Sequence, residues 1–213
     1  MDKQIDSKKA QIKPELYNVL STGLLLIGDV HGKVNDYWKI ISQTNKLSIQ
    51  VGDFGFKNQH EWHLKNIDFS QHQINFGNHD DYSFLHEPHS LSNFSIGNEY
   101  MTVRGADSID KGYRTENVDW WKNEELNYNE MQNAVEHYIH NKPKLMITHD
   151  CPQIVRQHLF GITDKSMTSN GLQMMFENHQ PDLWVFGHHH KSKDVVINGT
   201  RFVCLAELET MVV

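Results

Sequence analysis

The clearest structural signal in this chain is the segment Leu24-Leu25-Leu26-Ile27-Gly28-Asp29-Val30-His31-Gly32. A short, continuous apolar run stops abruptly at a Gly-Asp turn, and a histidine follows two residues after the aspartate. Such a run, bounded by turn residues, is typical of a strand that is buried on both faces. The sequence therefore predicts a buried strand whose carboxyl end carries side chains able to bind metals or move protons.

The same arrangement recurs four times downstream. The pairs of apolar run and polar turn are Leu47, Ile49 and Val51 before Gly52-Asp53; Ile74 and Phe76 before Gly77-Asn78-His79-Asp80; Leu145-Met146-Ile147 before Thr148-His149-Asp150; and Leu183-Trp184-Val185-Phe186 before Gly187-His188-His189-His190. In α/β sheets, ligands bind beyond the carboxyl ends of the strands. If these strands pair in one sandwich, the five polar clusters share one edge.

Helical patterns fall between the predicted strands. Val34, Tyr37, Trp38 and Ile41 follow the i, i+3, i+4, i+7 spacing of an amphipathic helix. A second helix is expected over residues 129–140, and a weaker one over residues 169–178. Strands that alternate with helices predict a layered α/β fold.

Two other segments complete the expected organisation. Asn198-Gly199 separates the apolar runs at residues 195–197 and 201–205, which is a strong hairpin signal. Residues 93–121 follow no clean period, so they are expected to hold two short strands at best and a long loop. No repeat or linker stands out. We therefore expect one domain over residues 1–213, with a polar N-terminal segment at residues 1–20.

Composition and charge exclude several classes of protein. The chain has 213 residues, a net charge of -7 and only two cysteines, which excludes a cysteine-rich zinc site and makes a disulfide framework implausible. The negative net charge does not indicate the basic surface that nucleic-acid-binding proteins usually have, although it does not exclude a local basic groove. The longest early apolar run, Leu24 to Ile27, is too short for a signal or membrane segment. A cytoplasmic location is expected.

The polar turns supply a candidate set of metal ligands. These are Asp29, His31, Asp53, Asn78, His149, His188 and His190. The donors are oxygen and imidazole with no thiolate, which suits Mn, Fe, Zn, Ni or Co, and manganese is the first choice. Seven ligands exceed what one tetrahedral zinc needs. They match two divalent ions that share a bridging carboxylate.

The sequence closely resembles the pattern of the calcineurin-like metallophosphoesterase superfamily. The motifs that carry the resemblance are, in chain order, D-x-H, G-D, G-N-H-D, H and G-H-x-H. The resemblance spans Gly28 to His190. It implies a four-layer α/β fold, in which a double β-sandwich is flanked by helices. It further implies one metal held by Asp29, His31, Asp53 and His190, and a second held by Asp53, Asn78, His149 and His188. Asp53 would then bridge the two ions, and His79 would be the general acid.

The resemblance also implies a reaction. Hydroxide shared by two metals would attack the phosphorus of a phosphate ester while His79 protonates the leaving group. The expected partner is a phosphorylated small molecule or a nucleotide, without a membrane. A nuclease or a cyclic-nucleotide phosphodiesterase that uses the same metals is an alternative. A non-catalytic binding scaffold is another.

One departure from the family pattern concerns the second motif. Protein Ser/Thr phosphatases of the superfamily carry G-D-x-V-D-R-G there. Here Phe56 stands where the Asp that orients the catalytic histidine is expected, and Lys57 stands where the phosphate-binding Arg is expected. A protein phosphatase is therefore disfavoured, and the partner that orients His79 is left open. Lys57, Arg104 and Arg114 are the candidate substrate contacts.

Overall fold

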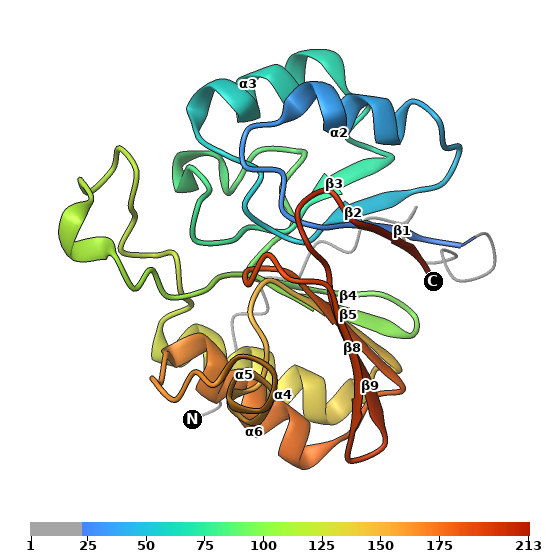
Figure 1. Ribbon diagram of the computed structural model, residues 1–213, viewed down its shortest axis with the longest axis vertical. Helices are drawn as coiled ribbons and strands as arrows, with labels where there is room; N and C mark the ends of the chain where they lie inside the picture. The colour runs from blue at the N-terminus through green and yellow to red at the C-terminus, as the bar shows by residue number, and fades with distance from the viewer. Residues whose placement is uncertain (1–22) are drawn as a thin grey trace, which may run out of the picture.

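The computed structural model describes residues 23–213, which form two β-sheets flanked by helices (Figure 1). The expected N-terminal polar segment, residues 1–20, lies outside the described residues. The four-stranded sheet has the order β10-β1-β2-β3 and is made of β10 (Thr210–Val212), β1 (Leu25–Ile27), β2 (Ser48–Gln50) and β3 (His72–Ile74). β1, β2 and β3 are parallel, and β10 pairs antiparallel with β1. The carboxyl ends of the three parallel strands therefore lie at one edge.

The second sheet has six strands in the order β4-β5-β6-β7-β9-β8. Their bounds are β4 (Phe94–Ile96), β5 (Tyr100–Val103), β6 (Leu145–Thr148), β7 (Leu183–Phe186), β9 (Thr200–Cys204) and β8 (Lys193–Ile197). β5, β6, β7 and β9 are parallel, and the strands at the two edges run antiparallel to their neighbours. β8 and β9 form the hairpin that Asn198-Gly199 predicts.

The helices cover the outer faces of the two sheets (Figure 1). α2 (Val34–Ile41) and α3 (Lys57–Asn66) lie on the four-stranded sheet, followed by the short 3-10 helix η2 (Tyr82–Phe84). α4 (Tyr128–Asn141), α5 (Gln153–Phe160) and α6 (Met167–Asn178) lie on the six-stranded sheet. The order of layers is helix, sheet, sheet, helix.

The side-chain pattern of β1 shows how the chain fills these layers. Leu24 and Leu26 point between the two sheets, whereas Leu25 and Ile27 point toward α2 and α3. Successive side chains of a strand face opposite sides, so a strand buried on both faces must be apolar throughout. A third apolar cluster joins the six-stranded sheet to α4, α5 and α6. The α/β double-sandwich prediction is confirmed.

The segment between β5 and α4 contains no strand and one 3-10 helix, η3 (Lys111–Tyr113). As expected, residues 93–121 hold two short strands, β4 and β5, and then a long loop. Residues 107–119, which we call the arm, project from the body of the molecule on the left of Figure 1. Ile109 and Tyr113 on the arm are exposed.

Two helices and one strand had no clear signal in the sequence. α3 buries His60 and His63, so its inward face does not read as apolar. α5 is short and buries only Val155 and Arg156. β10 is a three-residue edge strand with an exposed pattern. Over residues 23–213, none of the helices combines the length and the apolar character that a membrane crossing requires.

Candidate metal centre

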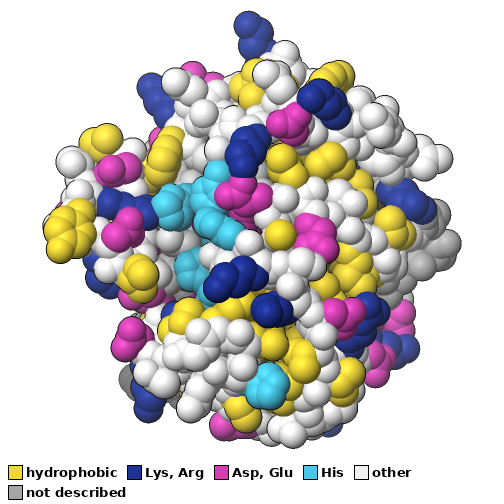
Figure 2. All heavy atoms as spheres, viewed as in Figure 1, with side chains coloured by type: hydrophobic (Ala, Val, Ile, Leu, Met, Phe, Trp, Pro, Cys, Tyr) yellow, Lys and Arg dark blue, Asp and Glu magenta, His cyan; other side chains and the backbone are white. Residues whose placement is uncertain are grey.

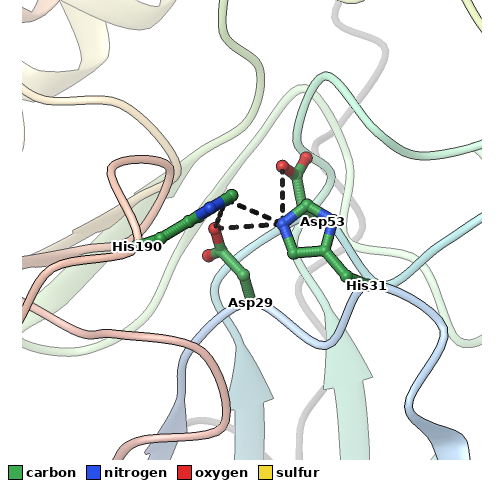
Figure 3. Close-up of side chains that lie close together, drawn as sticks. All are labelled: Asp29, His31, Asp53 and His190. Carbon is green, nitrogen blue, oxygen red and sulfur yellow. Dashed lines mark hydrogen bonds and ion pairs between the residues drawn. The ribbon is translucent and has the colours of Figure 1, made fainter.

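The polar turns after β1, β2, β3, β6 and β7 converge where the carboxyl ends of the two sheets meet. Asp29, His31, Asp53 and His190 place one ligand atom each within 4.8 Å of one another. Figure 3 shows these side chains pointing toward a common centre. His31 Nε2 lies 2.8 Å from His190 Nε2 and 3.6 Å from Asp53 Oδ2, and His190 Nε2 lies 3.2 Å from Asp29 Oδ2.

A second group lies on the other side of the same aspartate. Asp53, His149 and His188 also bring one ligand atom each within 4.8 Å of one another. Asp53 Oδ1 lies 3.1 Å from His149 Nε2, and Asn78 Oδ1 lies 3.2 Å from that same nitrogen. The structure thus brings together all seven candidate ligands, and the two oxygens of Asp53 face different groups. In the space-filling view, histidine side chains gather in a hollow beside the arm (Figure 2).

The backbone at these turns is unusual. His31, Asp53, His188 and His190 have positive φ angles of 45°, 59°, 65° and 52°, in the left-handed region that non-glycine residues rarely adopt. Such conformations persist only where surrounding contacts impose them, and they cluster at functional sites. Gly77 is needed for a different reason, because a Cβ atom there would overlap the Asp53 carboxylate and the His149 ring.

Burial and charge set the protonation of the ligands. Burial raises the pKa of Asp53, but the nearby imidazoles of His149, His79 and His31 together more than offset this and hold that pKa well below its ordinary value. Burial lowers the pKa of His149, and Asp53 outweighs burial and raises it to about 10. Burial lowers the pKa of His188 to about 3, so this imidazole is neutral near pH 7. A metal ion binds the deprotonated form of its ligands, so binding at such a site is expected to release protons.

The donors fit a pair of divalent cations. Asp53 Oδ2 is buried with no hydrogen-bond partner in the described part of the chain, and such an atom is costly unless something binds it. The imidazole nitrogens of His31 and His190 face each other across the same space. Oxygen and imidazole donors without thiolate suit Mn, Fe, Zn, Ni or Co. Asp53 is the one residue common to both groups.

His79 lies at the mouth of this centre. Its backbone N–H donates to Asp53 Oδ1 at 2.7 Å, and its half-buried ring lies 5.2 Å from the His31 ring. Its Nε2 lies 2.7 Å from Nη2 of Arg114. A guanidinium can only donate, so Nε2 accepts this hydrogen bond and the ring is neutral. Burial lowers the pKa of His79; Asp53 opposes this shift, and Arg114 adds to it.

The partner of His79 therefore comes from the arm. The guanidinium of Arg114 is itself held by the Asp110 carboxylate at 2.8 Å and the Asp119 carbonyl at 3.2 Å. Phe56, at the position where the family pattern suggests an aspartate, has its ring centroid 6.4 Å from that of His79 and packs on Trp121. The side chain that contacts His79 is thus a cation from a residue far along the chain, and not a carboxylate from the second motif.

The other two candidate substrate contacts are not brought to this site. Lys57 is the first residue of α3, where its exposed side chain pairs with Glu61 at 3.7 Å. Arg104 is buried, donates to the Asn93 side chain and the Asn123 carbonyl, and stacks over the Tyr82 ring. Arg104 lines a separate cavity of about 450 Å³. Of the three, only Arg114 reaches the metal centre.

A cavity of about 370 Å³ opens over the centre. Asp53, Asn78, His79 and His188 lie at its base, and its walls include Ile109, Arg114, Ile162 and Asp164. This volume is in the range of small-molecule sites. The arm forms one wall, which places Arg114 beside any ligand in the cavity.

Supporting residues that the sequence did not single out surround the ligands. Ser108 accepts a hydrogen bond from the Asn78 amide and donates to Glu124, which directs Asn78 Oδ1 toward His149. Because Ser108 follows no motif or period, the sequence carried no signal for it.

A second support lies beside the last motif. The ring of His189 stacks on Phe160 with centroids 3.9 Å apart, and its Nε2 lies 3.4 Å from Asp150 Oδ1. His189 separates the candidate ligands His188 and His190, so these contacts hold the loop that carries both. Its position between two candidate ligands was the only sequence signal for this role.

Comparisons with solved structures show a similar fold. No curated protein matches the chain in sequence. A dimetal phosphatase from Danio rerio is similar in structure, with a TM-score of 0.52 and 10% identity over 88% of this chain and 88% of that one. A putative 5'-nucleotidase from Staphylococcus aureus has a TM-score of 0.50 and 12% identity. The match covers 89% of this chain but only half of the nucleotidase. At these identities the two structures support the fold alone.

The family model for calcineurin-like phosphoesterases matches residues 23–192, which include the whole of the centre described above. The chain belongs to the calcineurin-like phosphoesterase family.

Proposed function

We propose that this protein hydrolyses a small phosphate ester at a centre of two divalent metal ions, manganese being the first choice. The observation that carries the proposal is the position of Asp53, whose two oxygens face two separate groups of ligands. Asp29, His31 and His190 would complete one ion site, and Asn78, His149 and His188 the other. When bound, such ions supply Lewis-acid activation of phosphate and of water.

Arg114 and Arg156 both line the cavity, and because Arg156 is buried with its Nε 3.6 Å from Asp150, Arg114 is the cation that we expect to bind the substrate. Its guanidinium lines the cavity wall beside His79, and on leaving its contacts with His79 and Asp110 it could bind two phosphate oxygens through two N–H groups. In this structure the Nη2 of Arg114 donates a hydrogen bond to Nε2 of His79, so that this nitrogen carries no proton. A phosphate that draws the guanidinium away frees this nitrogen to carry a proton.

Once the guanidinium has moved away, His79 Nε2 takes up a proton from solvent and then gives this proton to the leaving oxygen. Its ring lines the cavity and is anchored through its backbone N–H to Asp53, which fixes it relative to both ion sites. Positioned general acids of this kind contribute about 10²–10⁴-fold to the rate. Arg114 binding and His79 proton transfer thus act in sequence on one substrate.

The charge of the cavity supports a small substrate over a nucleic acid. Asp107, Asp110 and Asp164 line its wall, and a polyanion would meet these carboxylates. Lys111 pairs with Asp107, so Arg114 is the cation that the arm offers in this cavity, enough for one phosphate group but not for the successive phosphates of a nucleic acid. A nuclease or a cyclic-nucleotide phosphodiesterase remains the alternative within the same chemistry, and a cytoplasmic location stays a prediction of the sequence.

The test is a phosphate-release screen with added Mn²⁺ over monoesters, nucleotides, diesters and a short DNA. We expect the wild-type protein to release phosphate from p-nitrophenyl phosphate or from nucleoside monophosphates. We expect the Asp53→Asn variant to release none. Faster cleavage of bis-p-nitrophenyl phosphate or DNA would favour the diesterase alternative. Metal analysis of the purified protein tests the alternative of a non-catalytic scaffold. Fewer than one bound transition-metal ion per chain would favour that alternative. Activity that survives in Asp53→Asn would place the reaction elsewhere.

A further inference from the structure

A buried cluster of histidines lies under α3, on the side of the four-stranded sheet away from the second sheet. His60 and His63 come from the inward face of α3, and His89 comes from the loop after η2. All three are fully buried. None belongs to a motif of the family pattern. Buried imidazoles cost free energy unless their polar atoms interact, so their contacts indicate what they do.

The contact that matters for the metal centre is made to Asp80. This carboxylate is fully buried and accepts four backbone N–H bonds. Its Oδ2 accepts from Asp53 at 2.9 Å and from Gly77 at 2.7 Å, and its Oδ1 accepts from Phe54 at 2.8 Å and from Gly55 at 3.0 Å. Hydrogen bonds to a carboxylate are stronger than neutral ones. Asp80 therefore ties the loop after β2 to the loop after β3.

His60 is the side chain that holds this carboxylate from behind. Its Nε2 lies 3.2 Å from Asp80 Oδ1, as an electrostatic contact rather than a well-aligned hydrogen bond. Its ring lies between the rings of Phe76 and Phe84, with centroids 5.0 Å and 5.3 Å away and nearly parallel planes. Its Nδ1 lies 2.9 Å from His89 Nε2. The ring is thus fixed on both faces and both nitrogens.

We propose that His60 is a positioning residue of the metal centre, acting through Asp80 on the backbone of Asp53. Asp53 sits at φ 59°, and the bond from its N–H to Asp80 is one of the contacts that impose this conformation. Both ion sites depend on Asp53, so a shift of this loop disturbs both together. The inference rests on the proposed function in one respect: it takes the two groups of side chains that share Asp53 as ion sites.

The experiment compares His60→Phe with His63→Phe. Both residues are fully buried, both lie on α3, and both changes put a phenyl ring in place of an imidazole. His63 contacts the Tyr37 hydroxyl at 3.4 Å and the Phe54 ring, whereas the contact with the Asp80 carboxylate belongs to His60. The first readout is backbone hydrogen exchange in the metal-free protein. We expect faster exchange of the amides at residues 53–55 in His60→Phe and little change in His63→Phe.

The second readout is Mn²⁺ affinity measured by calorimetry. Loss of a residue that supports metal ligands weakens binding by about 10–100-fold, and we expect this for His60→Phe but not for His63→Phe. His60→Gln keeps an amide donor toward Asp80. It should recover part of the affinity and of the exchange protection, and it provides the test if His60→Phe does not fold.

Two results would overturn the proposal. One is equal behaviour of the His60 and His63 variants, and the other is normal exchange at residues 53–55 in the folded His60 variants. The failure of the proposed function has a different signature. A wild-type protein that binds Mn²⁺ yet releases no phosphate from any ester contradicts the phosphoesterase assignment, and the exchange comparison between the two variants still decides the role of His60.

Discussion

Asp53 and His149 are both buried, and the carboxylate Oδ1 of one lies 3.1 Å from the Nε2 of the other. The pair joins the loop after β2 in one sheet to the loop after β6 in the other. Asp53 also faces His31 through its second oxygen, 3.6 Å away. Asp53 is therefore the candidate ligand whose carboxylate faces side chains from both sheets.

Asp53→Asn should lower the metal content at both ion sites. The amide removes the negative charge that both groups share, and leaves Asp29 as the one carboxylate among the ligands. We expect metal analysis to show loss of both ions at a Mn²⁺ concentration that saturates the wild type. Asp29→Asn is the comparison, because it should weaken mainly the site with His31 and His190. Retention of one full ion in Asp53→Asn would contradict the shared role.

His79→Asn should reduce turnover in a way that depends on the leaving group. A general acid contributes about 10²–10⁴-fold, and the contribution shrinks when the departing oxygen needs no proton. We expect a large loss with alkyl phosphates and a much smaller one with p-nitrophenyl phosphate, while metal content stays unchanged. A loss of the same size for every leaving group would argue against proton donation by His79.

Arg114→Lys should raise KM for phosphate esters more than it lowers kcat. Hydrogen bonds to charged groups are worth about 1.5–3 kcal/mol, so the loss of bidentate binding should weaken substrate binding by roughly ten- to a hundredfold. Lys111→Ala is the matched control, because Lys111 lies on the same arm and pairs with Asp107. If both variants bind substrate equally well, the guanidinium is not the phosphate contact.

That the candidate ligands lie close together was predictable from the sequence because of how parallel strands pack. The carboxyl ends of β1, β2 and β3 must share an edge, and so must those of β6 and β7. Short turns leave the side chains that follow each strand little freedom of position. Side chains that each follow a parallel strand in the sequence therefore had to lie close together in space. These side chains are Asp29, Asp53, Asn78, His149 and His188.

Contacts made outside such turns were not predictable. α3 was missed because its buried face carries His60 and His63, and polar residues on a helix give no apolar period. Arg114 was recognised as a candidate, but its distance from His79 depends on the path of the arm. That path is set by contacts of Asp110 and Asp119 with Arg114 itself, which no periodicity reveals.

The buried histidines also predict how stability depends on pH. Burial lowers the pKa of His63 from its ordinary value of 6.5 to about 2, with the nearby imidazoles of His89, His60 and His72 acting in the same direction. The unfolded chain thus takes up a proton at this residue below pH 6.5, and the folded chain does not until far lower pH. The free energy of unfolding should therefore fall as pH drops below 6.5, by up to about 1.4 kcal/mol per pH unit for one proton.

His63→Phe removes this proton uptake. Urea unfolding of the metal-free protein should show a shallower decline of stability below pH 6.5 in the variant than in the wild type, even if the variant is less stable at neutral pH. The exposed His140 on α4 provides the control, and His140→Phe should keep the wild-type slope. Parallel pH profiles for wild type and His63→Phe would mean that His63 takes up its proton in the folded state as readily as in the unfolded one, against the burial seen here.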